Sequence, residues 1–148
     1  MSMQDEKNLS LQSEVPYPFQ NHLGFVLTEW RKDYCRVELP LKPFLLNRYG
    51  IPHGGIHATL LDTAMGYCAY YSDDPNAPLF AMTLSLNVNY LAQSTGTTLI
   101  AQANRTGGGR KTFFAEGTVT DNTGQTIATA TGVFRFRSGS GPNSDKKE

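Results

Sequence analysis

The spacing of hydrophobic residues changes along the chain, and the changes distinguish one helix from several strands. From about residue 55 to residue 71 apolar side chains recur at roughly helical spacing, and Ala and Gly fill much of the remainder. A helix this apolar is typical of a segment enclosed by other elements. From residue 81 to residue 91 the period becomes two, because Thr, Ser and Asn alternate with an apolar series, Met82, Leu84, Leu86, Val88 and Tyr90. The first segment predicts a central helix, and the second predicts a strand with one apolar face.

Further strands are predicted wherever β-branched and aromatic residues cluster, namely at 24–30, 34–41, 97–106, 111–120 and 126–137. The last two are separated by the sequence DNTGQ, which is typical of a hairpin turn. In the final strand Ala128, Ala130 and Gly132 place small side chains on one face, which would let a helix lie close to the sheet. The sum is an α+β domain in which a curled antiparallel sheet of five to six strands wraps around one long central helix.

The two ends of the chain are polar and predict flexible segments at 1–15 and 138–148, on either side of one domain at 16–137. A total of 148 residues suits a single domain whose core needs neither disulfides nor metal. Cys35 and Cys68 lie far apart and are interpreted as reduced, apolar residues.

The charge balance argues against two classes of partner. Thirteen Lys and Arg residues offset thirteen Asp and Glu residues, so no general field favours nucleic acid or an anionic membrane surface. No apolar run approaches the roughly 20 residues that span a bilayer, and the N-terminus lacks the apolar core of a signal peptide. We therefore expect a cytoplasmic protein with neither nucleic acid nor membrane as a partner.

The sequence His53-Gly54-Gly55 comes directly before the predicted helix. The first N–H groups of a helix have no partner inside it, and the helix dipole adds positive potential there. Such donors suit an oxygen that gains negative charge, for example a thioester carbonyl attacked by water. The alternative is that the glycine pair only permits a tight turn into the helix.

Asp62 is a carboxylate within an otherwise apolar stretch, which costs free energy unless the group is paired or used. The alternative is a narrow polar stripe shared with Thr59 and Thr63. Eight residues separate Asp62 from Gly54, which is about 12 Å along one helix. The two residues therefore cannot contact one carbonyl within a single chain. A second copy running antiparallel could bring Asp62 of one chain opposite Gly54 of the other, so a site that uses both requires at least a dimer.

Asn47, His53-Gly54-Gly55 and Asp62, followed by a strand at 83–91, resemble the hotdog-fold thioesterases. The resemblance covers about residues 22–137 and is closest to the PaaI-like group, which includes phenylacetyl-CoA thioesterases and medium- and long-chain acyl-CoA hydrolases. It implies a homodimer paired through the sheets, usually a tetramer formed by two dimers, with active sites between subunits.

The resemblance also implies roles for individual residues. Gly54 would donate its backbone N–H to the carbonyl of an acyl-CoA, Asp62 of the partner chain would act as general base or nucleophile, and Asn47 would orient water or substrate. His53 would support the loop, and Gly55 and Thr83 would lie near the substrate. A thioester is already activated, so we expect no metal and no organic cofactor.

The phosphates of CoA also need cations. Arg110 and Lys111, with Arg105, flank a glycine-rich turn, and Arg side chains and exposed N–H groups suit phosphate. The resemblance supports this interpretation. Arg48 is a further candidate for binding phosphate. The alternative is that the turn is a plain hairpin with solvated charges. Several aromatic residues are candidates for lining an acyl pocket, namely Phe44, Tyr67, Tyr70, Tyr71 and Phe80.

Other functions remain open from the sequence. His53 and His57 have the i, i+4 spacing of metal ligands, but no third ligand is evident and no metal site is predicted. A hotdog dehydratase or hydratase, a non-catalytic acyl-CoA-binding module and a purely structural dimer are the alternatives to thioester hydrolysis. The acyl group, and the choice between CoA and acyl carrier protein as its carrier, do not follow from the sequence.

Overall fold

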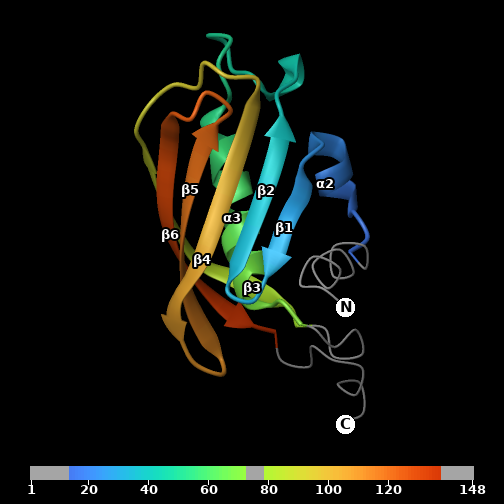
Figure 1. The fold of residues 1–148 in the computed structure, drawn as a ribbon, viewed down its shortest axis with the longest axis vertical. Helices are drawn as coiled ribbons and strands as arrows, with labels where there is room; N and C mark the ends of the chain where they lie inside the picture. Colours follow the sequence, from blue (N-terminus) through green and yellow to red (C-terminus); the bar gives the residue numbers. More distant parts are fainter. Residues whose placement is uncertain (1–13, 73–78, 138–148) are drawn as a thin grey trace.

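The computed structural model describes residues 14–72 and 79–137. Six antiparallel strands form one curled sheet in the order β1 (Val26–Arg31), β2 (Tyr34–Pro40), β4 (Thr98–Gly108), β5 (Thr112–Asp121), β6 (Thr126–Phe136) and β3 (Ala81–Tyr90). The long helix α3 (Gly54–Ala69) lies behind these strands, against one face of the sheet (Figure 1). This arrangement confirms the predicted α+β hotdog fold, and no predicted boundary of these elements differs from the observed one by more than two residues.

Two short elements escaped prediction. Helix α2 (Pro18–Leu23) begins with a proline at its first position and ends at Gly24, whose φ of 90° is left-handed. A 3₁₀ turn (Pro43–Leu45) lies within the long loop before α3. Of the terminal segments predicted to be flexible, only Glu14 and Val15 are among the described residues.

The core forms where α3 meets the sheet. Leu60, Leu61, Ala64 and Met65 are fully buried on the helix. Close approach is possible because small residues face them: a Cβ at Gly117 would lie 3.0 Å from Leu61 Cδ2 and 3.3 Å from Met65 Cγ. Ala128 and Ala130 are buried on β6, as the small-residue face of that strand predicted. Cys35 and Cys68 are both free and buried within the same core.

A β-bulge changes which side chains of β3 face the helix. The register between β3 and β6 shifts between Thr83 and Ser85. Thr83 lies opposite Phe134, which is buried under the helix, and Leu86 lies opposite Gly132 on the same side. An extra residue in one strand reverses the alternation beyond it, so Thr83 shares a face with Leu86 although Leu86 lies three positions further along the strand.

The prediction of strict alternation along this strand was therefore wrong before the bulge. Met82 and Leu84 are 50% and 58% exposed, whereas Leu86 and Val88 pack against the core. Since β3 is an edge strand of the sheet, the exposed residues lie beside an unpaired backbone edge.

Asp121 anchors the loop between β3 and β4 to the β5–β6 hairpin. Its side chain is only 1% exposed, and it accepts hydrogen bonds from Ser94 Oγ (3.0 Å), from the N–H groups of Thr95 and Gly96 (both 3.1 Å) and from Thr123. These donors, led by the Thr123 hydroxyl, hold the pKa of Asp121 well below its ordinary value of 3.8.

Asp121→Asn should lower the free energy of unfolding at pH 7 by about 1–2 kcal/mol, because the amide replaces a charged acceptor and offers one oxygen to part-buried donors that now share two. The stabilisation by Asp121 is present above its unfolded-state pKa and is lost as the pH falls below about 4. Urea unfolding at pH 7 and pH 3 checks this: the difference between parent and variant should shrink at pH 3. Asp33→Asn, in the β1–β2 turn, is the matched control, and equal stability of Asp121→Asn and parent at pH 7 would contradict the prediction.

No helix among the described residues is long and apolar enough to cross a membrane.

Candidate active site

Within the described part of the chain, one backbone donor at the start of α3 has no hydrogen-bond partner. His53 caps the helix: its Nδ1 accepts the Gly55 N–H at 2.9 Å, and its carbonyl accepts the Ile56 N–H at 2.9 Å. No hydrogen bond within residues 14–72 and 79–137 uses the Gly54 N–H. Of the two glycines, Gly54 therefore offers the available donor, and the Gly55 N–H is already engaged by the cap.

Two side chains hold the peptides on either side of Gly54. Tyr90, at the end of β3, donates its hydroxyl to the Gly54 carbonyl at 2.6 Å. His57 Nδ1 lies 3.2 Å from the His53 carbonyl oxygen. A carbonyl can only accept, so this contact assigns the proton to Nδ1. The His53 carbonyl and the Gly54 N–H belong to the same peptide group, and a hydrogen bond to its oxygen polarises its N–H.

Sequence reasoning considered His57 only as a metal ligand. His57 is 5% exposed, and burial lowers the pKa of its ring below 6.5, which favours the neutral form at pH 7. Its Nε2 is buried and has no hydrogen-bond partner among the described residues. Within the same residues no group of three or more His, Cys, Asp or Glu side chains is arranged to hold a metal ion.

A hollow of about 350 Å³, here called the helix-start pocket, opens at this end of α3. Its lining includes Asn47, Gly54, His57 and Tyr90. Asn47 Oδ1 accepts the N–H groups of Tyr49 (2.9 Å) and Ile51 (3.4 Å), so this oxygen shapes the loop. The NH₂ group of Asn47 is the part of the side chain that remains to serve a ligand.

Asp62 lies two turns further along α3 and is half-buried. Thr83 Oγ1 donates a 2.6 Å hydrogen bond to Asp62 Oδ1, and the bulge in β3 is what turns Thr83 towards the helix. Asp62 opens into a second hollow of about 200 Å³, here called the Asp62 pocket, whose described lining is Tyr17, Asp62, Thr63, Gly66, Tyr67, Tyr70, Ala81, Thr83 and Phe134. The structure thus brings Asp62 and Thr83 together.

Gly54 and Asp62 do not meet within one chain. Both belong to the continuous helix α3 and line different pockets. Their separation of eight residues corresponds to about 12 Å along the axis. A single thioester cannot contact both, so a reaction that uses both residues needs a second chain.

The candidate cations are spread over both ends of the sheet. Arg48 is exposed in the loop beside Asn47, near the start of α3. Arg110 and Lys111 are exposed in the β4–β5 hairpin, at the opposite end of the sheet from that loop (Figure 1). Arg105 braces the hairpin by donating to the carbonyls of Gly107 (3.1 Å) and Gly109 (3.4 Å).

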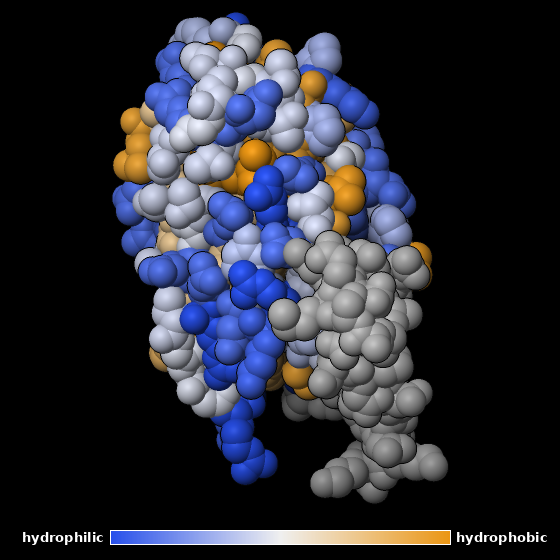
Figure 2. Space-filling view, viewed as in Figure 1, coloured by the Kyte–Doolittle hydropathy of each residue, from blue (hydrophilic) through white to orange (hydrophobic). Residues whose placement is uncertain are grey.

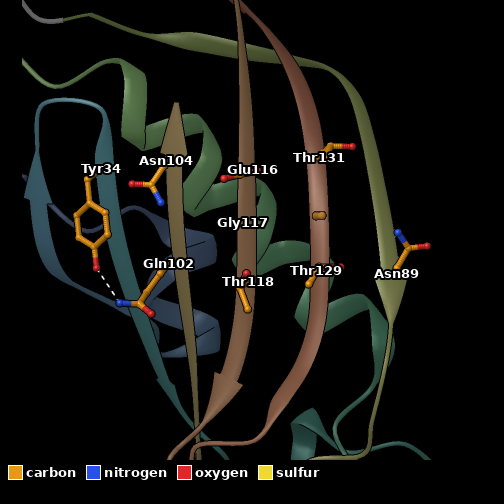
Figure 3. Close-up of a pocket in the computed structure, with 10 residues that line it drawn as sticks. Tyr34, Asn89, Gln102, Asn104, Glu116, Gly117, Thr118, Thr129 and Thr131 are labelled. Carbon is orange, nitrogen blue, oxygen red and sulfur yellow. Dashed lines mark hydrogen bonds between the residues drawn. The ribbon is translucent and has the colours of Figure 1, made fainter. Parts of the chain in front are cut away.

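A third hollow, of about 470 Å³, lies on the face of the sheet opposite α3. Figure 3 shows its polar side chains, which include the carboxylate of Glu116, rising from neighbouring strands, with Gln102 donating to the Tyr34 hydroxyl at 2.8 Å. Figure 2 shows this side of the molecule as largely hydrophilic. None of the predicted site residues lines this hollow; Gly54, Asp62 and Thr83 line the two hollows beside α3.

Comparisons with known proteins identify the family and the fold. A family model described as the thioesterase superfamily matches residues 49–128, more than half of the 148-residue chain. A stretch of 56 residues is 32% identical to the candidate esterase Rv1847 of Mycobacterium tuberculosis, covering 38% of this chain and 40% of that protein. The match thus spans less than half the length of this curated relative.

Solved structures share the fold over most of the chain. The Escherichia coli PaaI protein, from the phenylacetic acid degradation operon, superposes with a TM-score of 0.76 and 20% identity over 90% of this chain and 95% of its own. The BH2602 protein of Bacillus halodurans, solved with CoA, has a TM-score of 0.63 and 38% identity over 69% of this chain and 66% of its own. The family model and the shared architecture lead to one conclusion: this chain belongs to the thioesterase superfamily and has its hotdog fold.

Proposed function

We propose that this protein is an acyl-CoA thioesterase that hydrolyses the thioester to a carboxylic acid and free CoA. The observation that carries the proposal is the pairing, on one helix, of a free N–H donor at Gly54 with a carboxylate at Asp62 that Thr83 holds in place. Membership in the thioesterase superfamily supports it, and so does BH2602, whose structure contains CoA.

The chemistry follows from these groups. The Gly54 N–H, polarised through its own peptide by His57, binds the carbonyl oxygen and stabilises the negative charge that develops there. The bond to Thr83 occupies one oxygen of Asp62, and the other oxygen is left to take a proton from water. The water oxygen bonds to the carbonyl carbon, the C–S bond breaks, and the CoA thiolate takes up the proton that Asp62 accepted. Direct attack by Asp62, giving an anhydride that water then hydrolyses, uses the same geometry.

The active unit in this proposal is a homodimer, or a tetramer of two dimers, in which Asp62 of one chain serves the helix-start pocket of the other. The separation of Gly54 and Asp62 by about 12 Å along α3 is one support. The edge strand β3 is another, because Met82, Leu84 and Tyr90 are at least half exposed beside its unpaired edge. A second copy that paired there would cover these side chains and bring the two helices alongside each other.

The direct test measures thiol release from acyl-CoAs with short, long and aromatic acyl groups, with product acids identified by mass spectrometry. Blanks correct for the protein's own thiols, which are buried at Cys35 and Cys68. The proposal expects catalytic release of CoA together with the matching carboxylic acid. Binding of the same esters by calorimetry without any release would instead indicate a non-catalytic acyl-CoA-binding module.

For the nucleotide end of CoA we propose Arg110 and Lys111 as phosphate-binding cations; Arg48, at the other end of the sheet (Figure 1), is the alternative candidate. Arg110→Ala should raise KM for CoA esters several-fold, because exposed charges attract phosphate with only modest energy. It should leave KM for the matching N-acetylcysteamine thioesters, which lack the nucleotide, unchanged. Lys32→Ala, an exposed cation in the β1–β2 turn, is the control, and an equal rise in KM for both classes of ester would remove the assignment.

A further inference from the structure

The Asp62 pocket has a wall that comes from outside the hotdog sheet and helix. Tyr17, which precedes α2, lines the pocket and is 37% exposed, so its ring forms the rim between the pocket and solvent. The ring packs edge-on against the buried Phe25, with centroids 6.1 Å apart. Three residues earlier, Glu14 Oε2 accepts a 3.0 Å hydrogen bond from the hydroxyl of Tyr67, another lining residue. The segment 14–17 is thus tied to the pocket at two points.

The lining indicates which part of a substrate this pocket suits. Three tyrosines form much of the wall, and its described residues include no Lys or Arg. The phosphates of CoA need cations, so the nucleotide is poorly matched to this space. The volume of about 200 Å³ is below the roughly 300–1,000 Å³ of pockets that enclose a whole ligand. A fragment such as an acyl group beside the reacting carbonyl fits both observations.

The charged side chains beside the pocket, Asp62 and Glu14, are both negative. Burial raises the pKa of the Tyr17 hydroxyl, and the nearby carboxylates of Asp62 and Glu14 raise it further. A second carboxylate at the end of an acyl group would be repelled by both. The pocket therefore favours acyl groups without a negative charge.

We infer that Tyr17 and Glu14 determine acyl specificity: Tyr17 limits the pocket to short or single-ring acyl groups, and Glu14 excludes acyl groups that carry a carboxylate. This inference rests on the proposed thioesterase activity and extends it to the substrate class. Sequence patterns did not indicate either residue, since the contacts of Tyr17 and Glu14 with Thr63 and Tyr67 join segments far apart in the chain.

The test measures kcat/KM for phenylacetyl-, hexanoyl-, palmitoyl- and glutaryl-CoA, each as a ratio to phenylacetyl-CoA. The parent should favour the neutral short and ring esters. Tyr17→Ala opens the rim so that a long chain can leave the pocket along the surface, and it should raise the palmitoyl ratio at least about tenfold. Tyr17→Leu, which keeps an apolar side chain against Phe25, should shift the ratio in the same direction by less. Glu14→Gln should raise the glutaryl ratio and leave the palmitoyl ratio unchanged.

Two controls separate this role from general damage. Tyr17→Phe keeps the ring in the rim and should preserve the parent ratios, and Phe19→Ala removes an exposed aromatic residue from the same segment outside the pocket. Unchanged ratios in folded, active Tyr17→Ala and Tyr17→Leu, or a parent that hydrolyses palmitoyl-CoA as well as phenylacetyl-CoA, would overturn the assignment while leaving the proposed function standing. A parent that hydrolyses none of the esters would overturn the proposed function and this assignment together.

Discussion

Replacing Asp62 with asparagine should lower kcat for acyl-CoA hydrolysis by about 10²–10⁴-fold, the usual contribution of a positioned general base. The amide cannot accept a proton from water or attack the thioester. In the parent, Thr83 donates a 2.6 Å hydrogen bond to Asp62 Oδ1. The amide oxygen of asparagine can still accept this hydrogen bond, so the local packing should be preserved. KM should change little, because the lost interaction belongs to the transition state. Steady-state CoA release, compared with the parent under identical conditions, measures the effect.

The control for this substitution is Asp33→Asn, the same chemical change at a partly exposed turn residue with φ of 60°, a conformation that asparagine tolerates. It should retain the parent rate. Thermal unfolding of both variants establishes that the fold is intact. A folded Asp62→Asn variant that turns over at the parent rate would remove Asp62 from the mechanism.

Much of the fold follows from local patterns. The helical spacing at 55–71 and the strand composition of the other segments predicted α3 and a sheet of five to six strands, of which the structure has six, because burial on one face dictates periodicity. The bulge in β3 was not predictable in this way. Thr83, Leu84 and Ser85 read as ordinary alternating residues, and the shift exists only in the pairing with β6. Helix α2 escaped because its six residues are too few for a periodic signal.

Some features of the candidate site could likewise be predicted from the sequence, and others could not. Gly54 and Asp62 can be picked out from the sequence. Their spacing also predicts that one helix keeps them apart. Which glycine has a free N–H depends on the His53 cap, and the contact of His57 with the His53 carbonyl depends on side-chain orientation. The positions of Tyr17 and Glu14 depend on how the chain before α2 folds back onto α3. The cap and the His57 contact are local but depend on side-chain orientation, which hydrophobic periodicity does not encode. The placement of Tyr17 and Glu14 is tertiary.

The second large effect is expected at Gly54. Gly54→Pro deletes the backbone N–H and nothing else that the helix needs. The first position of a helix favours proline. His53 already has the extended conformation (φ −62°, ψ 135°) that the residue before a proline requires. Losing one donor to a developing oxyanion should lower kcat about 10²–10³-fold. Gly54→Ala retains the N–H, and its Cβ would lie 3.4 Å from the Tyr90 ring, so this variant should keep most of the activity. Equal losses in both variants would indicate crowding rather than a missing donor.

The claim that one thioester is served by Gly54 of one chain and Asp62 of another is tested most directly by mixing two inactive variants. Equal amounts of Asp62→Asn and Gly54→Pro protein are unfolded, combined and refolded, and differently sized tags report the heterodimers by native mass spectrometry. In a symmetric dimer, each heterodimer contains one site with both residues intact. Random pairing makes half of the molecules heterodimers, so the mixture should regain about a quarter of the parent activity. Heterodimers that form in the expected amount, with activity no higher than the mean of the two variants, would contradict a site shared between chains.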